Sequence, residues 1–140
     1  MSIEKNREEG LRWLKTAEND LEAAAILKKS GKYSLACFHA QQAAEKAIKS
    51  LYYALDKETW GHSIFKLFQG LQKEYPGFKD KKLKLDTKAK RLDQFYISTR
   101  YPNGLPDITP EEAFGDEDAT ISIAYAKVFI DVVRKYYKKK

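Results

Sequence analysis

A row of polar side chains at helical spacing lies in the segment Tyr33–Leu55. The row consists of His39, Gln42, Lys46 and Lys49, at positions i, i+3, i+7 and i+10, and this spacing places all four on one side of a helix. A row so rich in donors could hold phosphates or the carboxylates of a partner. The alternative is a solvated face on which Glu45 and Lys49 form an i,i+4 ion pair. Spacing alone leaves both interpretations open.

A second polar group lies near the middle of the chain. Asp93, Tyr96 and Arg100 share one face of an expected helix, and Arg100 falls at its end, directly before Tyr101-Pro102. The guanidinium fork of an arginine suits the geometry of phosphate. In the alternative interpretation Arg100 caps helix carbonyls or pairs with Asp93. Tyr101 either stacks on a base or pins the loop that follows.

The two histidines of the chain, His39 and His62, do not indicate a metal site. His62 directly precedes Ser63, an N-cap residue type, where an imidazole can bind a helix end. His39 lies far from it in the sequence, and Cys37 is the one cysteine, so no metal site or cofactor is predicted. The sequence contains no phosphate-binding glycine loop, nucleophile elbow or zinc-protease motif. The sequence therefore matches none of these catalytic motifs.

Composition and charge restrict the class of protein. The chain has 140 residues, 43% hydrophobic and 33% charged, which predicts one globular domain over residues 1–140. A single cysteine and the lack of a long apolar run predict a cytoplasmic protein that is not embedded in a membrane. The net charge is +6 with a pI of about 9.2, which permits but does not demand binding to nucleic acid.

The charge is unevenly distributed along the chain. Lys79–Arg91 contains seven basic and two acidic residues, a local charge of +5, and Asp107–Asp118 contains six acidic residues and no basic one, a local charge of −6. We call these the basic segment and the acidic segment.

Apolar periodicity near 3.6 predicts helices throughout and no strand. The expected helices cover about Glu4–Lys29, ended by Gly31; Tyr33–Leu55, with an alanine-rich face; Ser63–Glu74; Leu83–Thr99; and Asp116–Tyr137. Thr109-Pro110-Glu111-Glu112 predicts a short capped turn. The fold class expected is therefore all-α: an antiparallel, up-down four-helix bundle with a short additional helix.

Four blocks of sequence resemble the HEPN domain (higher eukaryotes and prokaryotes nucleotide-binding). The blocks begin at Trp13-Leu14, at Tyr33 with the run 36–49 that contains Gln41-Gln42 and Glu45-Lys46, at Gly61-His62-Ser63-Ile64, and at Leu92-Asp93 with Thr99-Arg100-Tyr101-Pro102. The resemblance covers about residues 11–133. It implies the up-down bundle, a homodimer, and a genomic pairing with a minimal nucleotidyltransferase in a system of the toxin-antitoxin type.

Some HEPN proteins are metal-independent ribonucleases, in which a histidine follows an arginine after four to six residues. Here the corresponding positions after Arg100 are Leu105, Pro106 and Asp107, so this motif is incomplete and the prediction leans away from an enzyme. The leading hypothesis is a non-catalytic module that binds a nucleotide, an RNA or a nucleotidyltransferase partner. Its candidate ligand-binding residues are His39, Gln42, Lys46, Lys49, His62, Asp93, Tyr96, Arg100 and Tyr101.

Two other functions stay open. The chain could be a ribonuclease toxin with a displaced catalytic base, or a purely structural assembly module in which the polar row and Arg100 serve a dimer interface.

Overall fold

The protein is seen here as a computed structural model, which describes residues 2–138, and its regular structure is entirely helical. The α-helices are α1 (Ile3–Lys29), α2 (Tyr33–Ala54), α3 (Ile64–Gln69), α4 (Leu85–Asp93), α5 (Phe95–Ser98), α6 (Pro110–Ala113) and α7 (Asp116–Lys138). Three 3₁₀-helices, η1 (Pro76–Lys79), η2 (Lys81–Leu83) and η3 (Pro102–Gly104), lie in the connections. Within residues 2–138 no helix is both long and apolar enough to cross a membrane.

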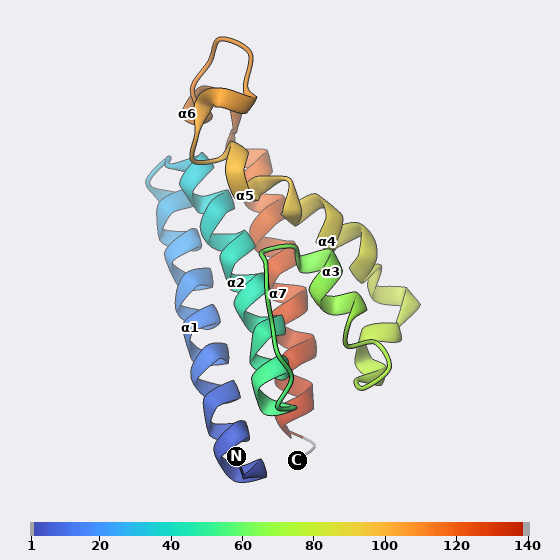
Figure 1. Ribbon diagram of the computed structural model, residues 1–140. Coiled ribbons are helices and arrows are strands. Elements are labelled where there is room, and N and C mark those ends of the chain that lie inside the picture. Colours follow the sequence, from blue (N-terminus) through green and yellow to red (C-terminus); the bar gives the residue numbers. More distant parts are fainter. Residues whose placement is uncertain (1, 139–140) are drawn as a thin grey trace.

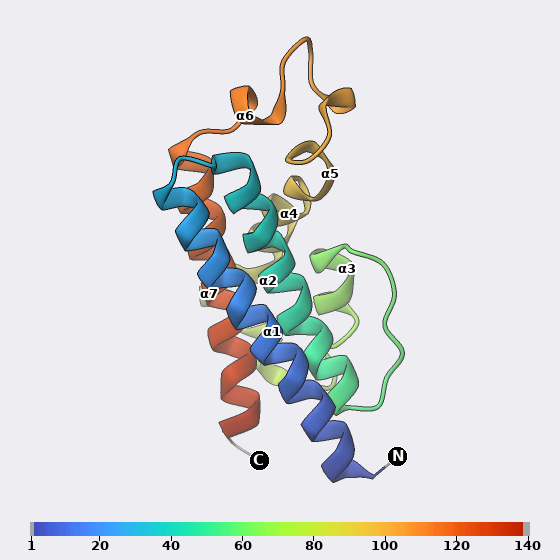
Figure 2. The same ribbon diagram turned by 90° about the vertical axis from the view of Figure 1, so that its left-hand side faces the viewer.

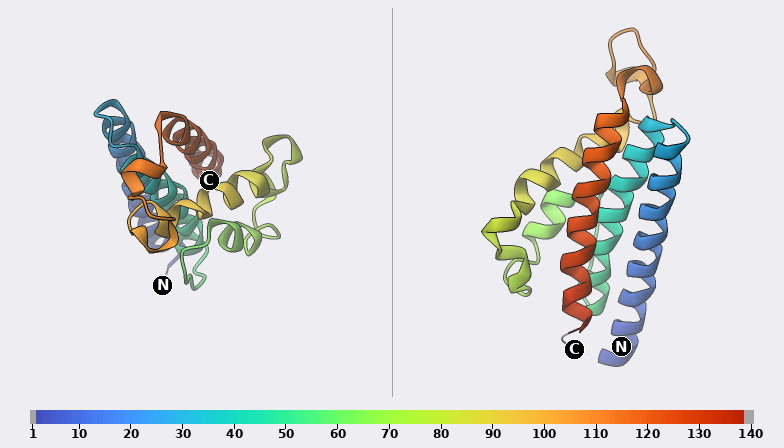
Figure 3. Two further views of the ribbon diagram at one scale, coloured as in Figure 1. Left: turned by 90° about the horizontal axis from the view of Figure 1, so that it is seen from above. Right: turned by 180° about the vertical axis from the view of Figure 1, so that it is seen from behind.

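The long helices α1, α2 and α7 lie side by side, with α1 antiparallel to α2 and α7 (Figure 1). The chain leaves α2 near the end where the termini lie, and residues 55–63 run back along the bundle to start α3 (Figure 2). Helices α4 and α5 then return along the other side of α7, and α6 sits beyond the end opposite the termini (Figure 3). If α4 and α5 are counted as one helix, then α1, α2, α4–α5 and α7 alternate in direction along the chain. This arrangement confirms the predicted all-α up-down bundle.

Small residues on α2 allow its neighbours to approach closely. Ala36, Ala40, Ala43, Ala44 and Ala47 are all fully buried, because α2 packs against both α1 and α7, which also contact each other. Ile48 and Leu51 continue this face toward the C-terminal end of the helix. A helix enclosed by neighbours keeps few solvated positions, so the polar side chains of α2 must find partners within the protein.

The predicted helix ends are confirmed where a cap residue specifies them. The Ser63 side chain accepts a hydrogen bond from the N–H of Lys66 (3.2 Å) at the start of α3. Thr109 and Glu112 form a complete capping box on α6. Helix α1 ends before Gly31, whose positive φ of 78° turns the chain toward α2.

Two predicted helices differ in extent. The expected helix 63–74 ends at Gln69, because Tyr52 donates its hydroxyl to the carbonyl of Leu67 (2.7 Å) and lies against Gly70, where a Cβ would collide with that hydroxyl. The expected helix 83–99 is divided at Gln94, whose N–H reaches the carbonyl of Arg91 (3.2 Å) in a tighter turn. The basic segment forms the end of η1, all of η2 and most of α4.

Gly10 marks the closest approach between α1 and the rest of the bundle. A Cβ built there would overlap Tyr137 Oη and lie 2.7 Å from the carbonyl oxygen of Ser50. The Tyr137 hydroxyl donates to that same carbonyl (3.1 Å), and burial raises its pKa to about 12. A methyl group at position 10 would therefore displace a buried hydrogen bond.

We expect Gly10→Ala to lower the free energy of unfolding by about 2 kcal/mol, although alanine favours helix, because overpacking outweighs propensity. Urea denaturation followed by circular dichroism measures this. Gly104→Ala, at a position with open space around it, should stay within about 0.5 kcal/mol of the wild type. A more stable Gly10→Ala protein would contradict the close approach.

Candidate functional site

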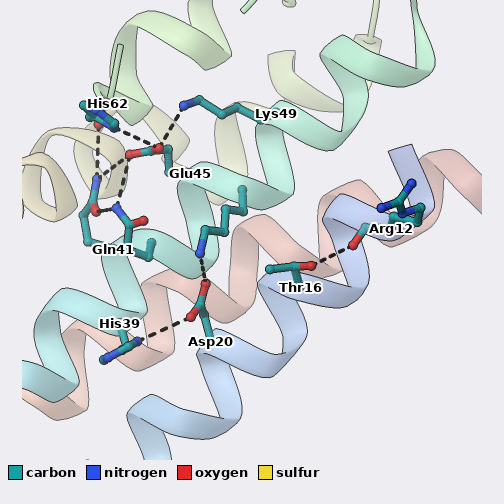
Figure 4. Close-up of polar contacts among 10 residues, drawn as sticks. Arg12, Thr16, Asp20, His39, Gln41, Glu45, Lys49 and His62 are labelled. Atoms are coloured by element: carbon teal, nitrogen blue, oxygen red, sulfur yellow. Dashed lines mark hydrogen bonds and ion pairs between the residues drawn. The ribbon is translucent and has the colours of Figure 1, made fainter. Parts of the chain in front are cut away.

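The carboxylate of Glu45 on α2 is the centre of a polar cluster. Its side chain is 3% exposed. Lys49 Nζ lies 3.0 Å from Oε2, and His62 Nδ1 lies 3.2 Å from the same atom. Gln41 and Gln42 donate their amides to Oε1 at 3.3 and 3.5 Å. Figure 4 shows His62 and Lys49 converging on Glu45 from opposite directions.

The position of His62 depends on the segment that joins α2 to α3. Gln41 donates a hydrogen bond to the carbonyl of His62 (3.2 Å), so both the backbone and the ring of this residue are held against α2. The expectation that this imidazole binds the end of α3 is not realised. The ring instead stacks on Tyr96, with 4.5 Å between centroids and 19° between planes.

Asp93 caps α3 in place of His62. Its carboxylate accepts hydrogen bonds from the N–H groups of Ile64 (2.6 Å) and Phe65 (3.2 Å) and from the Ser63 hydroxyl (2.9 Å). Partial burial raises the pKa of the Asp93 carboxyl, Glu45 adds to the rise, and the three hydrogen bonds oppose it. Asp93 therefore fixes α3 to the end of α4 and does not pair with Arg100.

The polar row of α2 divides between two carboxylates. Lys46 Nζ donates to Asp20 Oδ2 on α1 (2.7 Å), and His39 Nδ1 lies 3.4 Å from Asp20 Oδ1. Figure 4 shows His39 next to Asp20. Gln42 and Lys49 turn toward Glu45. Both lysines of the row are therefore already paired with carboxylates inside the protein. The Glu45–Lys49 ion pair expected as the alternative is present, but it is buried and does not lie on a solvated face.

Arg100 lies on aromatic rings at the end of α5. The centre of its guanidinium is 4.4 Å from the ring centroid of Phe38, 4.7 Å from that of Tyr96 and 5.1 Å from that of Tyr101. Nε donates to the carbonyl of Tyr96 (3.0 Å), which confirms the expectation that Arg100 binds a helix carbonyl. Three rings and one hydrogen bond thus fix the plane of the guanidinium.

Arg100 differs from the other four arginines in its partners. Arg12, Arg91 and Arg134 form ion pairs with Glu9, with Asp118, and with Glu18 and Asp131. Arg7 donates to the carbonyl of Tyr137. Among residues 2–138, no carboxylate pairs with Arg100 and no acceptor takes its terminal Nη groups. These donors are therefore available to an external anion.

The candidate residues form one connected group rather than a single pocket. Lys49 and His62 meet at Glu45, His62 stacks on Tyr96, and Arg100 lies on Tyr96 and Phe38. Phe38 contacts the ring of His39 at a centroid distance of 5.5 Å, and His39 leads to Asp20 and Lys46. Tyr101 lies beside Arg100 and is 50% exposed. Asp93 joins this group only through the capping of α3.

Besides Gln41, which holds the backbone of His62, three residues around these side chains are not among the predicted site residues. Phe38, Asp20 and Glu45 supply the ring under Arg100 and the two counter-charges. A signal for Glu45 exists in the i,i+4 spacing to Lys49. Asp20 and Phe38 act across 19 or more positions of sequence, and helix periodicity cannot specify such contacts. Within the described chain, no three His, Cys, Asp or Glu side chains are grouped as metal ligands would be.

The sequence and the fold match known proteins over most of the chain. A family model described as the HEPN domain matches residues 11–136. The chain belongs to the HEPN domain family. The crystal structure of TT1696 from Thermus thermophilus superposes with a TM-score of 0.84 at 34% identity, covering 91% of this chain and 97% of that one.

Other relatives agree with this membership. The crystal structure of ST0689, an archaeal HEPN homologue, superposes with a TM-score of 0.73 at 34% identity, covering 91% of this chain and 97% of that one. A protein of Methanocaldococcus jannaschii named "Putative toxin MJ1304" is 29% identical over 133 residues, which is 91% of this chain and 88% of the relative. The HEPN fold therefore positions the Glu45 cluster and Arg100 in this protein.

We expect Glu45→Ala to destabilise the protein by about 3 kcal/mol, because it leaves Lys49, only 11% exposed, as a buried charge without its counter-charge. Urea denaturation measures the loss. The double variant Glu45→Ala/Lys49→Met should recover much of it, since both charges are then removed. The control Glu9→Ala removes a carboxylate from an exposed pair and should change stability little. A loss no larger for Glu45→Ala than for Glu9→Ala would contradict the role of the cluster.

Proposed function

We propose that this HEPN protein is a non-cleaving binding component that engages the phosphate of a nucleotide or of RNA at Arg100. The observation that carries the proposal is the guanidinium held by three rings with its terminal donors unpaired. A guanidinium fixed in this way loses little freedom on binding, and its fork can give two parallel hydrogen bonds to phosphate.

Neighbouring groups support a nucleotide rather than a bare anion. The half-exposed ring of Tyr101 lies next to Arg100 and could stack on a base. The lysines of the α2 row are paired with Asp20 and Glu45, so they add little net positive charge. We therefore assign the first contact with phosphate to Arg100, and a secondary role to His39, Gln42, Lys46 and Lys49.

The biological setting is proposed from the family and the toxin-named relative. We propose a cytoplasmic homodimer of single-domain chains, in which the partner of a two-gene system is a minimal nucleotidyltransferase. A purely structural role of Arg100 at a dimer interface is the competing assignment. Under that assignment, Arg100→Ala would change the oligomeric state measured by sedimentation and not the affinity for a nucleotide.

We expect Arg100→Ala to weaken binding of AMP and of a short oligouridylate by at least about tenfold, because two oriented donors are lost. The affinity of Arg100→Lys should lie between those of the wild type and Arg100→Ala, since lysine keeps the charge but lacks the guanidinium fork. The control Arg12→Ala removes the same charge from an exposed site and should cost about twofold or less. Fluorescence anisotropy at two salt concentrations measures all four proteins. Equal losses for Arg100→Ala and Arg12→Ala would leave only non-specific electrostatic attraction and reject the site.

The structure also favours a specific form of the competing ribonuclease function. His62 and Arg100 contact the same ring, that of Tyr96, and the Nδ1 atom of His62 faces the buried carboxylate of Glu45. The imidazole is 52% exposed. An imidazole oriented by a carboxylate can move a proton at its other nitrogen, and a nearby guanidinium can stabilise phosphorane charge. Both histidines face a carboxylate, but His62 is the stronger candidate for a displaced base, because its more exposed ring stacks on Tyr96, which also contacts Arg100, whereas His39 meets Phe38 only edge to face.

We expect the purified protein to leave RNA uncleaved above background in the presence of EDTA, because the arginine-to-histidine motif is incomplete. The assay compares wild type, Arg100→Ala, His62→Ala and His39→Ala on a labelled RNA. Cleavage that needs both Arg100 and His62 but survives His39→Ala would overturn the non-cleaving assignment and establish His62 as the base.

A further inference from the structure

The lysines of the basic segment have no carboxylate partners within the described part of the chain. Its lysines are Lys79, Lys81, Lys82, Lys84, Lys88 and Lys90. In the described part of the chain the lysines with carboxylate partners are Lys28, Lys46, Lys49 and Lys57, and none belongs to this segment. These six lysines lie close together along η1, η2 and α4, apart from the Arg100 site.

A pocket of about 650 Å³ opens among these lysines, between α3 and the two 3₁₀-helices. Its buried lining comes from Phe68, Phe78 and Leu85, and Phe65 is partly exposed in it. Lys79, Lys81 and Lys84 are the exposed basic residues of its lining. An apolar hollow bordered by unpaired ammonium groups suits a ligand that is both apolar and acidic.

Two carboxylates also line the pocket, and both serve local structure. Asp80 caps η2 by accepting a hydrogen bond from the N–H of Lys82 (3.0 Å). Asp86 lies in the first turn of α4, where a negative charge offsets the helix dipole. The lining therefore keeps an excess of one positive charge, from three lysines against two aspartates.

The aromatic lining does not offer a stacking platform for bases. Phe68 and Phe78 are each 2% exposed, and their rings meet edge to face at 5.9 Å. The ring of Phe65 carries the ammonium group of Lys90 at 4.9 Å. A base needs an exposed ring face, whereas an aliphatic or aromatic side chain can fill an apolar hollow from above. The geometry therefore favours a peptide over a nucleic acid.

The acidic segment of a second copy is a poor occupant. Asp116 pairs with Lys28, and Asp118 pairs with Arg91. Glu112 completes the capping box of α6, and Glu111 accepts a hydrogen bond from Ser34. These carboxylates already stabilise their own chain, so docking them elsewhere would break existing contacts.

We propose that the pocket binds an acidic amphipathic segment of a different protein, with one large apolar side chain inserted against the partly exposed Phe65. Flanking aspartate or glutamate side chains then pair with Lys79, Lys81 and Lys84. Buried apolar anchors give such interfaces most of their affinity, and the charged border gives orientation and speed of association. This surface is separate from Arg100 and does not depend on the proposed binding of phosphate.

The test uses two fluorescent peptides of equal charge, each with eight acidic residues. One has a central Leu-Phe pair and the other a central Ser-Ser pair, and an oligouridylate of similar charge is the third probe. We expect the full-length protein to bind the Leu-Phe peptide at least about tenfold more tightly than the Ser-Ser peptide, because the anchor is buried. Amide resonances of residues 65–86 should shift in NMR spectra during that titration.

Two double variants separate the pocket from general charge. Lys79→Glu/Lys81→Glu should lower the affinity for the Leu-Phe peptide by at least about tenfold. The matched control Lys15→Glu/Lys29→Glu on α1 should lower that affinity by about twofold or less. Arg100→Ala should leave peptide affinity unchanged, so a failure here is distinguishable from a failure of the phosphate site. Equal affinity for the two peptides would reject the apolar anchor. Tighter binding of the oligouridylate, lost in the same Lys79→Glu/Lys81→Glu protein, would make this a nucleic-acid surface instead.

Discussion

The burial of the Glu45 carboxylate is the constraint on which the site depends. A carboxylate enclosed in a helical bundle is tolerated only with donors around it, and here Lys49, His62 and two glutamines supply them. Because His62 comes from the segment after α2, satisfying Glu45 draws that segment back along the bundle. The start of α3, and with it the Asp93 cap, is placed by the same requirement.

The cluster also explains why Arg100 remains available. Glu45 is occupied by Lys49 and His62, Asp20 by Lys46, and Asp93 by the N-terminus of α3. Each of these three carboxylates therefore has another partner within the protein, and none of them pairs with Arg100. Aromatic rings hold the guanidinium instead. The rings stabilise its positive charge and leave its Nη–H groups free to donate hydrogen bonds. The arrangement separates the stability of the fold from the binding of an anion.

The sequence predicted the features of this protein that depend on local pattern. Helix periodicity, the Ser63 and Thr109 caps and the Glu45–Lys49 spacing are short-range features, and the structure contains all of them. Contacts between distant elements were not predictable: Asp20 with Lys46, Phe38 under Arg100, and Asp93 on the amides of α3. The break at Gln94 was not predictable either, since no proline or glycine marks it.

The central claim is that the free Nη groups of Arg100 receive a phosphate. NMR observation of the arginine side-chain nitrogens during titration with AMP tests this most directly. We expect the Arg100 Nε and Nη resonances to shift and saturate together with the Tyr101 ring signals, while those of Arg12 and Arg134 stay in place. Saturable shifts confined to the basic segment 79–91, with Arg100 unmoved, would contradict the claim.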